Sequence, residues 1–117
     1  LSKVMHIADA ECAAGGYPLG DSRCVNRNRD VFIQQLKIGD SSACNSTFGT
    51  PTGVTLDANQ VITDYLTNAG ARAAALSNIL TLSGGEIAFV SEAFFRTPEL
   101  DIPGYRSGNS VYARTIF

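Results

Sequence analysis

The sequence predicts an α+β fold, in which a C-terminal antiparallel β-sheet follows the end of an N-terminal helix and two short helices. The strand signal is clearest in residues 84–98, where apolar and charged side chains alternate. This period of two is typical of a half-buried antiparallel strand. One face carries Ile87, Phe89, Ala93 and Phe95, and the other carries Glu86, Glu92 and Arg96. A chain of 117 residues supports one core, so we expect a single domain over residues 1–117.

Three segments ahead of this strand have apolar residues at helical spacing. Residues 1–13 have no start signal before them, so we interpret them as the end of a longer helix. Residues 29–37 are expected to form a second helix that is capped by Asn28. Residues 69–80 are rich in alanine and follow the N-cap residue Asn68, which predicts a third helix.

The remaining segments are expected to be loops and a second strand. Residues 40–59 are rich in Ser, Thr, Asn, Gly and Pro, which predicts a long loop with a short strand near residues 54–56. Residues 110–117 alternate more weakly and are expected to pair with residues 84–98. We expect the core of this sheet to contain Phe89, Phe95 and Phe117.

The three cysteines indicate an oxidising compartment. Cys12 and Cys24 bracket a loop that contains Gly and Pro, and we favour their pairing as a disulfide. A bridge across so short a loop would contribute about 3 kcal/mol. Cys44 leaves two alternatives open, because it could replace one of the two partners or be buried as a free thiol.

Charge and composition exclude several classes of function. A net charge of −2 and an isoelectric point near 5.2 provide no broad attraction for nucleic acid or anionic lipid. The basic cluster of Arg23, Arg27 and Arg29 is flanked by Asp21 and Asp30. We interpret it as a self-compensated solvated face, with anion binding as the alternative. We therefore expect no nucleic-acid partner and no small-molecule substrate.

No catalytic, cofactor-binding or metal-binding residues are expected. His6 is the single histidine, and no nucleophile in a sharp turn lies near it in the sequence. The cysteine spacings lack the close pair that is typical of a zinc site. Glu86 and Glu92 share a strand face, but a separation of six residues spans roughly 20 Å, too far for a pair of catalytic carboxylates. We therefore expect a protein that is not an enzyme.

Glu92 is the charged residue with the clearest expected structural role. Its place on the predicted strand indicates a half-buried carboxylate in an ion pair with one of three arginines, Arg72, Arg96 or Arg114. The alternative is a partner of opposite charge on a neighbouring subunit.

Four segments of the chain resemble TadE-like proteins, the minor pilins (pseudopilins) of the tight-adherence (Tad/Flp) pilus system. They are ARAAAL at 71–76, GEIAFVSEAFF at 85–95, PELDIPG at 98–104 and YARTIF at 112–117. The strongest piece is the strand in which Glu92 precedes two aromatic residues and a proline. The resemblance covers about residues 65–117, which is under half of the chain.

The resemblance implies a pilin-like head domain behind a short leader and one hydrophobic N-terminal helix. Residues 1–13 would be the solvent-side end of that transmembrane helix, which is absent or removed here and would be the only contact with a membrane. The implied function is non-catalytic assembly with other pilin-like subunits into a pilus that serves surface adhesion. The implied location is the periplasm or cell exterior, with anchoring in the inner membrane before assembly. Tyr112 and Arg114 lie on the candidate contact surface.

The alternative function belongs to another class of protein. It is a small secreted binding module, stapled by a disulfide between Cys12 and Cys24, that recognises a surface glycan or protein. In that interpretation the long loop, residues 40–59, is the recognition element.

Overall fold

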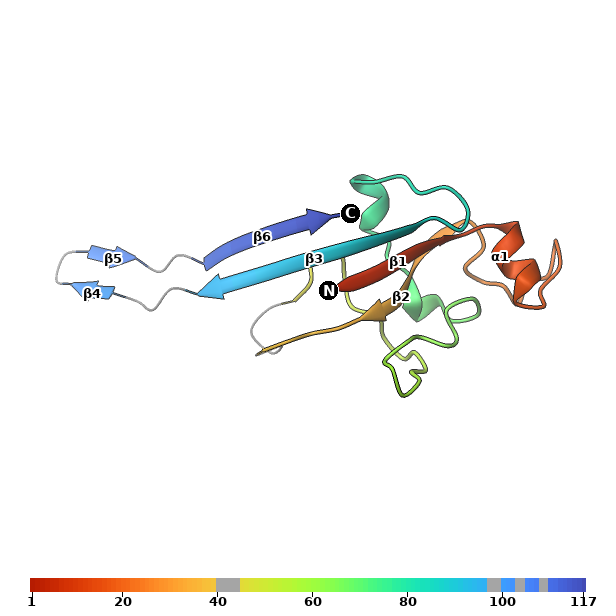
Figure 1. Ribbon diagram of the computed structural model, residues 1–117, viewed down its shortest axis with the longest axis horizontal. Helices are drawn as coiled ribbons and strands as arrows, with labels where there is room; N and C mark the ends of the chain where they lie inside the picture. The colour runs from red at the N-terminus through yellow and green to blue at the C-terminus, as the bar shows by residue number, and fades with distance from the viewer. Residues whose placement is uncertain (40–44, 97–99, 103–104, 108–109) are drawn as a thin grey trace.

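The computed structural model is built mainly from antiparallel strands, and it describes residues 1–39, 45–96, 100–102, 105–107 and 110–117. The main sheet has the order β2-β1-β3-β6 and consists of β1 (Ser2–Ile7), β2 (Arg29–Gln35), β3 (Ile87–Arg96) and β6 (Ser110–Ile116) (Figure 1). Two short strands, β4 (Leu100–Ile102) and β5 (Tyr105–Ser107), pair with each other. Helical structure in the described residues is limited to α1 (Asp9–Ala14) and two 3-10 turns, η1 (Ala69–Ala71) and η2 (Leu76–Asn78).

The predicted α+β class is therefore wrong, and so is the arrangement of helices that a pilin-like head would have. The one α-helix of the described residues has six residues, whereas strands provide the main sheet. The error comes from segments in which helical and strand patterns compete, because short apolar runs fit both periods. The conformation of each of these segments is set by the segment with which it pairs in the tertiary structure.

The first predicted helix, residues 1–13, is instead β1 followed by α1. β1 lies inside the sheet and pairs antiparallel with β2 on one side and with β3 on the other. The two ladders bond its backbone groups on both edges, and its residues Ser2, Val4 and Ile7 are buried. The interpretation of residues 1–13 as the end of a helix is wrong for this reason.

The second predicted helix, residues 29–37, is instead β2. Val31, Phe32 and Ile33 are consecutive and all buried, which a strand covered on both faces allows and a single helix face does not. β-branched and aromatic residues also favour strands. Asn28 is not a helix cap, because it adopts a left-handed backbone conformation with φ of 56° at the turn before β2.

The third predicted helix, residues 69–80, is reduced to the turns η1 and η2. Asn68 caps η1 as predicted, because its side chain accepts a hydrogen bond from the Gly70 N–H at 2.9 Å. Between the two turns, the Ala73 N–H donates to the Asp30 carbonyl at 2.8 Å. This bond to β2 uses a backbone donor that a continuous α-helix would need for itself.

The two C-terminal strands and their antiparallel pairing are confirmed. The register places Glu92 opposite Arg114 and Ala93 opposite Ala113. The short strand expected near residues 54–56 is present only as an isolated bridge from Leu56 to Ile62. Residues 40–44, with Cys44 and the start of the predicted loop, lie outside the described residues.

The core forms where the main sheet is covered by the connecting segments. Phe32 is its largest fully buried side chain. The strands add Val4, Ile7, Val31, Ala88 and Val90, and the connecting segments add Cys12, Cys24, Phe48, Ile62, Leu66 and Leu76. The core therefore lies in the half of the molecule where the connecting segments cover the sheet. Of the C-terminal strands, only the first residues of β3 and the end of β6 contribute to this core.

The predicted sheet core of three phenylalanines is wrong. Phe89, Phe95 and Phe117 are 37%, 60% and 69% exposed. The buried face of β3 is the alternate one, which carries Ala88 and Val90. Alternation separates the two faces of a strand, but it does not say which face the rest of the chain will cover.

The molecule is elongated, with principal extents of 66 × 28 × 19 Å. The length arises because β3 and β6 continue beyond the other strands of the sheet toward β4 and β5 (Figure 1). Among the described residues, none of the helices has the length and apolar character needed to cross a bilayer.

Candidate functional site

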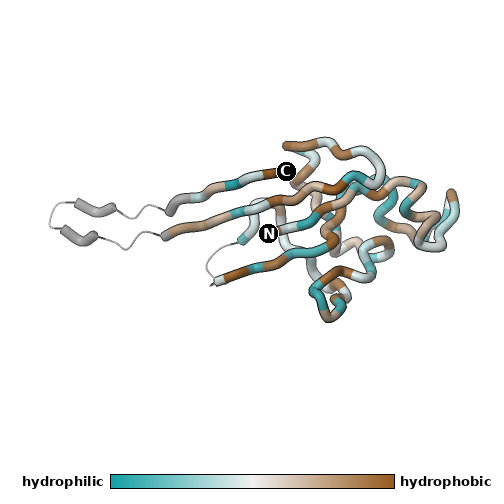
Figure 2. Tube along the Cα trace, viewed as in Figure 1, coloured by the Kyte–Doolittle hydropathy of each residue, from teal (hydrophilic) through white to brown (hydrophobic). Residues whose placement is uncertain are grey.

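The outer part of the β3–β6 hairpin projects from the main sheet. β1 pairs with β3 only from Ile87 to Val90, whereas β6 pairs with β3 from Val90 to Arg96. Residues 91–96 and 110–115 are therefore a two-stranded extension, which we call the arm (Figure 1). Hydrophobic residues continue along most of the described length of β3 toward the arm (Figure 2).

Glu92 lies at the base of the arm and is held by hydroxyl groups. Its Oε1 atom accepts from the Thr47 N–H at 2.9 Å, the Thr47 hydroxyl at 2.7 Å and the Tyr112 hydroxyl at 3.1 Å. Its Oε2 atom accepts from the Ser46 hydroxyl. These bonds join the segment that contains Ser46 and Thr47 to both strands of the arm. Glu92 therefore fixes the base of the arm against residues 1–90, the part of the molecule that holds the core, which we call the head.

The hydrogen bonds also decide the charge state of Glu92. Partial burial favours its neutral form, but the donors on Ser46, Thr47 and Tyr112 outweigh burial and hold the pKa of Glu92 below its ordinary value. The side chain is therefore a carboxylate at neutral pH.

The predicted ion pair of Glu92 is replaced by these hydroxyl contacts. Arg72 donates instead to the Asn26 side chain and to the Val25 carbonyl, both at 2.8 Å. Arg114 lies opposite Glu92 in the register, but its guanidinium lies 5.3 Å from the ring centre of Phe48. Among the described side chains, Glu92 has no ion pair. The side chain of Arg96 lies outside the described residues.

Replacing Glu92 with glutamine is expected to destabilise the protein at pH 7 and to have a smaller effect in acid. A lowered folded-state pKa contributes stability that is present above the unfolded pKa of about 4.3 and is lost as the pH falls through the folded pKa. Protonated Glu92 resembles glutamine, so the difference between the two proteins should shrink at low pH. The urea midpoints of the two proteins at pH 7 and pH 3 measure this difference in stability. A difference of equal size at both pH values would contradict the role of the Glu92 carboxylate.

Both faces of the arm carry exposed aromatic side chains. On the face that carries Glu92, called the Glu92 face, the rings of Phe94 and Tyr112 are 4.9 Å apart and are 37% and 40% exposed. The opposite face, called the Phe95 face, carries Phe95. It continues toward the main sheet in Phe89 and Phe117, whose rings stack at 5.9 Å. No single core covers these side chains, so they form two apolar surfaces.

The opposite end of the molecule contains the disulfide. Cys12 in α1 and Cys24 are bonded as predicted, and both are buried. In the basic cluster nearby, the flanking residue Asp21 compensates an arginine as expected, but Asp30, the other flanking residue, bonds to His6 instead. Arg23 pairs with Asp21 at 2.7 Å, and its hydrogen bonds hold the pKa of Asp21 at about 2. Arg27 pairs with Asp9.

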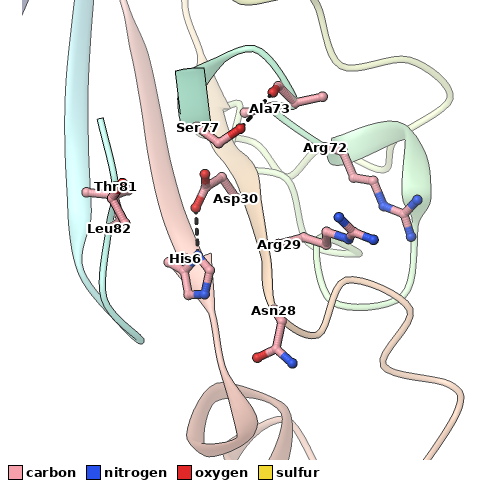
Figure 3. A pocket seen from close by; sticks show the side chains of 10 residues that line it. His6, Asn28, Arg29, Asp30, Arg72, Ala73, Ser77, Thr81 and Leu82 are labelled. Atoms are coloured by element: carbon pink, nitrogen blue, oxygen red, sulfur yellow. Dashed lines mark hydrogen bonds and ion pairs between the residues drawn. The ribbon is translucent and has the colours of Figure 1, made fainter. Parts of the chain in front are cut away.

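A separate hollow of about 410 Å³ lies beside β1 and β2. His6, which is on β1 and not on a helix, bonds through Nδ1 to Asp30 at 2.7 Å (Figure 3). Ser77 also lines the hollow, but its hydroxyl donates to the Ala74 carbonyl at 3.2 Å. The histidine is thus paired with a carboxylate, and the Ser77 hydroxyl is paired with the backbone.

Sequence reasoning missed the polar residues that hold the structure together. Asn26 is fully buried, and its side chain donates to the Tyr65 and Asn68 carbonyls, both at 2.7 Å. Ser46 and Thr47 stand out in the sequence only as part of a glycosylation-type Asn-Ser-Thr triplet. Their role depends on a contact across 45 or more positions of the chain, which no local pattern encodes.

Comparison of the chain with protein-family models, with curated proteins and with solved structures finds no match.

Proposed function

We propose that this chain is a non-catalytic subunit of a tight-adherence pilus, which assembles with other pilin-like subunits in the periplasm or on the cell surface. The observation that carries the proposal is the arm, a two-stranded ribbon with exposed aromatic residues on both faces. The arm also falls within residues 65–117, the part of the chain that resembles TadE-like minor pilins.

The physical argument is that the arm is incomplete as an isolated structure. A two-stranded ribbon is at best marginally stable in water, and three or more strands or a covering layer are needed for stability. Phe95 is 60% exposed and Phe94 is 37% exposed, on opposite faces. Exposed apolar patches of this kind are typical of surfaces that bind other proteins. A neighbouring subunit on the arm would bury them.

Two further features support the location and the class of function. The Cys12–Cys24 disulfide is typical of proteins outside the cytoplasm. The exposed aromatic residues lie on the arm, outside the hollow near His6, where His6 is paired with Asp30. Pilus assembly and adhesion therefore fit the chain better than turnover of a small substrate.

The alternative, a secreted module that binds through residues 40–59, is not favoured. The described part of this segment is anchored to the body of the protein, because Phe48 is buried and Thr47 bonds to Glu92. A recognition loop would be expected to keep such side chains free for its ligand.

Replacing Phe95 with lysine is expected to abolish assembly while leaving the fold intact. A charge on the exposed Phe95 face would have to be desolvated in any contact, whereas in the free subunit it stays in water. The measurement is chemical cross-linking of the tagged protein on the cells that produce it, followed by the size of the cross-linked species.

The matched control is Leu19→Lys, which changes a side chain that is 79% exposed in the disulfide loop. We expect its cross-linked species to equal those of the parent, and both variants to unfold at the parent's temperature. Cross-linked species that persist in Phe95→Lys would overturn the proposal.

A further inference from the structure

The outer edge of β6 has a defined set of unpaired backbone groups. Phe89 and Phe117 exchange both hydrogen bonds, from the Phe89 N–H at 2.7 Å and from the Phe117 N–H at 3.0 Å. In an antiparallel pair the residues that bond to the neighbouring strand alternate with residues that point away from it. The N–H and C=O groups that point away from β3 therefore belong to Ser110, Tyr112, Arg114 and Ile116.

This edge is suited to pairing with another strand. β6 is the last strand of the main sheet, and no described residue pairs with its outer side. Its sequence, Ser-Val-Tyr-Ala-Arg-Thr-Ile, is rich in residues that favour strands and contains one charge and no proline. A free edge of this kind is a template for strand addition.

We propose that the β6 edge pairs antiparallel with the β6 edge of a second copy of this chain, with the two-fold axis at Ala113. This inference rests on the proposed function, because it names the first partner in assembly. Centred at Ala113, the pairing uses every outward residue, since Tyr112 faces Arg114 of the second copy and Ser110 faces Ile116. Closed two-fold contacts of this type are the commonest in protein assemblies.

Charge complementarity favours this register, and it favours a second copy of the chain as the partner. Arg114 of the second copy would lie beside Tyr112, whose hydroxyl is 3.1 Å from the Glu92 carboxylate. Glu92 has no ion pair among the described side chains of its own chain. On leaving the Phe48 ring of its own chain, the guanidinium would approach both the carboxylate and the tyrosine ring. A register shifted so that Arg114 faces itself would place like charges opposite each other.

Disulfide trapping tests the register directly. In a Cys44→Ser background, Ala113→Cys would place two thiols in a pair that is not hydrogen-bonded, with Cα atoms about 4.5 Å apart, which a disulfide can bridge. Thr115→Cys is the matched control on the same strand. Its copies would be about 14 Å apart, because they are offset by four residues along the strand and lie on neighbouring strands.

The Ala113→Cys protein is expected to form covalent dimers under mild oxidation at least about tenfold faster than the Thr115→Cys protein, because its thiols are held at high effective concentration. Adding Arg114→Glu to Ala113→Cys should slow dimer formation, since the introduced carboxylate of one copy would approach Glu92 of the other. Its thermal unfolding must match that of Ala113→Cys, because the new carboxylate also lies opposite Glu92 of its own chain. Equal rates for the two cysteine variants, or no effect of the added charge, would overturn the inference.

The two proposals fail separately. If Ala113→Cys does not form dimers while Phe95→Lys still abolishes cross-linked species on cells, the β6 pairing is wrong and the proposed function stands. If Ala113→Cys forms dimers and Phe95→Lys assembles like the parent, the β6 pairing stands and the proposed function is overturned.

Discussion

Replacing Phe32 with alanine is expected to lower the free energy of unfolding by about 3–5 kcal/mol. Phe32, in β2, is the largest fully buried side chain of the core. Its truncation removes buried apolar surface and leaves a cavity, because close-packed neighbours relax only in part. Urea or thermal unfolding of the purified protein measures the loss.

The matched control for Phe32→Ala is Phe95→Ala, the same substitution on the exposed face of the arm. Phe95 is 60% exposed, so we expect a change of about 0.5 kcal/mol or less. Equal losses for the two variants would show that the Phe95 face is packed within the subunit, in line with the core expected from the strand's alternation. A small loss for Phe32→Ala would contradict the position of the core.

The second large effect is expected from the disulfide. The Cys12→Ser/Cys24→Ser variant should lose about 2–5 kcal/mol of stability, because the bridge restricts the unfolded chain and both sulfurs are buried. Urea unfolding with and without a reducing agent provides an internal control. The parent should fall to the stability of the variant when it is reduced, and the variant should not respond. A parent that keeps its midpoint on reduction would contradict the role of the bridge.

The residues that stabilise the fold and the residues to which we assign assembly lie at opposite ends of the molecule. The disulfide, α1 and the buried core stabilise the head, whereas the arm exposes its aromatic residues. Glu92 connects the two, because Ser46 and Thr47 of the head donate to a carboxylate on the arm. Substitutions on the arm's faces should therefore change assembly more than folding, and substitutions in the head should do the reverse.

Several features could be predicted from the sequence because their causes are local. The alternation in residues 84–98 and 110–117 predicted two strands, and the Cys12–Cys24 pairing was expected from a short bracketed loop. The cap at Asn68 was also predicted, since the bond from the Gly70 N–H to the Asn68 side chain spans only two residues and forms whether a long helix or a single turn comes after it.

The helix predictions were wrong because the interactions that decide the conformation of these segments are not local. Residues 1–13 and 29–37 contain apolar residues whose spacing fits both a helix and a strand. Residues 2–7 and 29–35 form strands because β1 pairs with both β2 and β3. The alanine-rich segment 69–80 has high helix propensity, but Ala73 donates its N–H to Asp30 on β2. Pairing over long sequence distances contributes more than the few tenths of a kcal/mol per residue of local propensity.

Neighbouring residues in the chain are enough to specify the two C-terminal strands, the cap at Asn68 and the disulfide. The buried face of β3 and the groups that hold Glu92 are instead set by tertiary packing. A strand pattern is symmetric between its two faces, so it cannot choose between them. The choice depends on where the distant segment with Phe48 and Thr47 packs, and the exposure of the arm depends on the same packing.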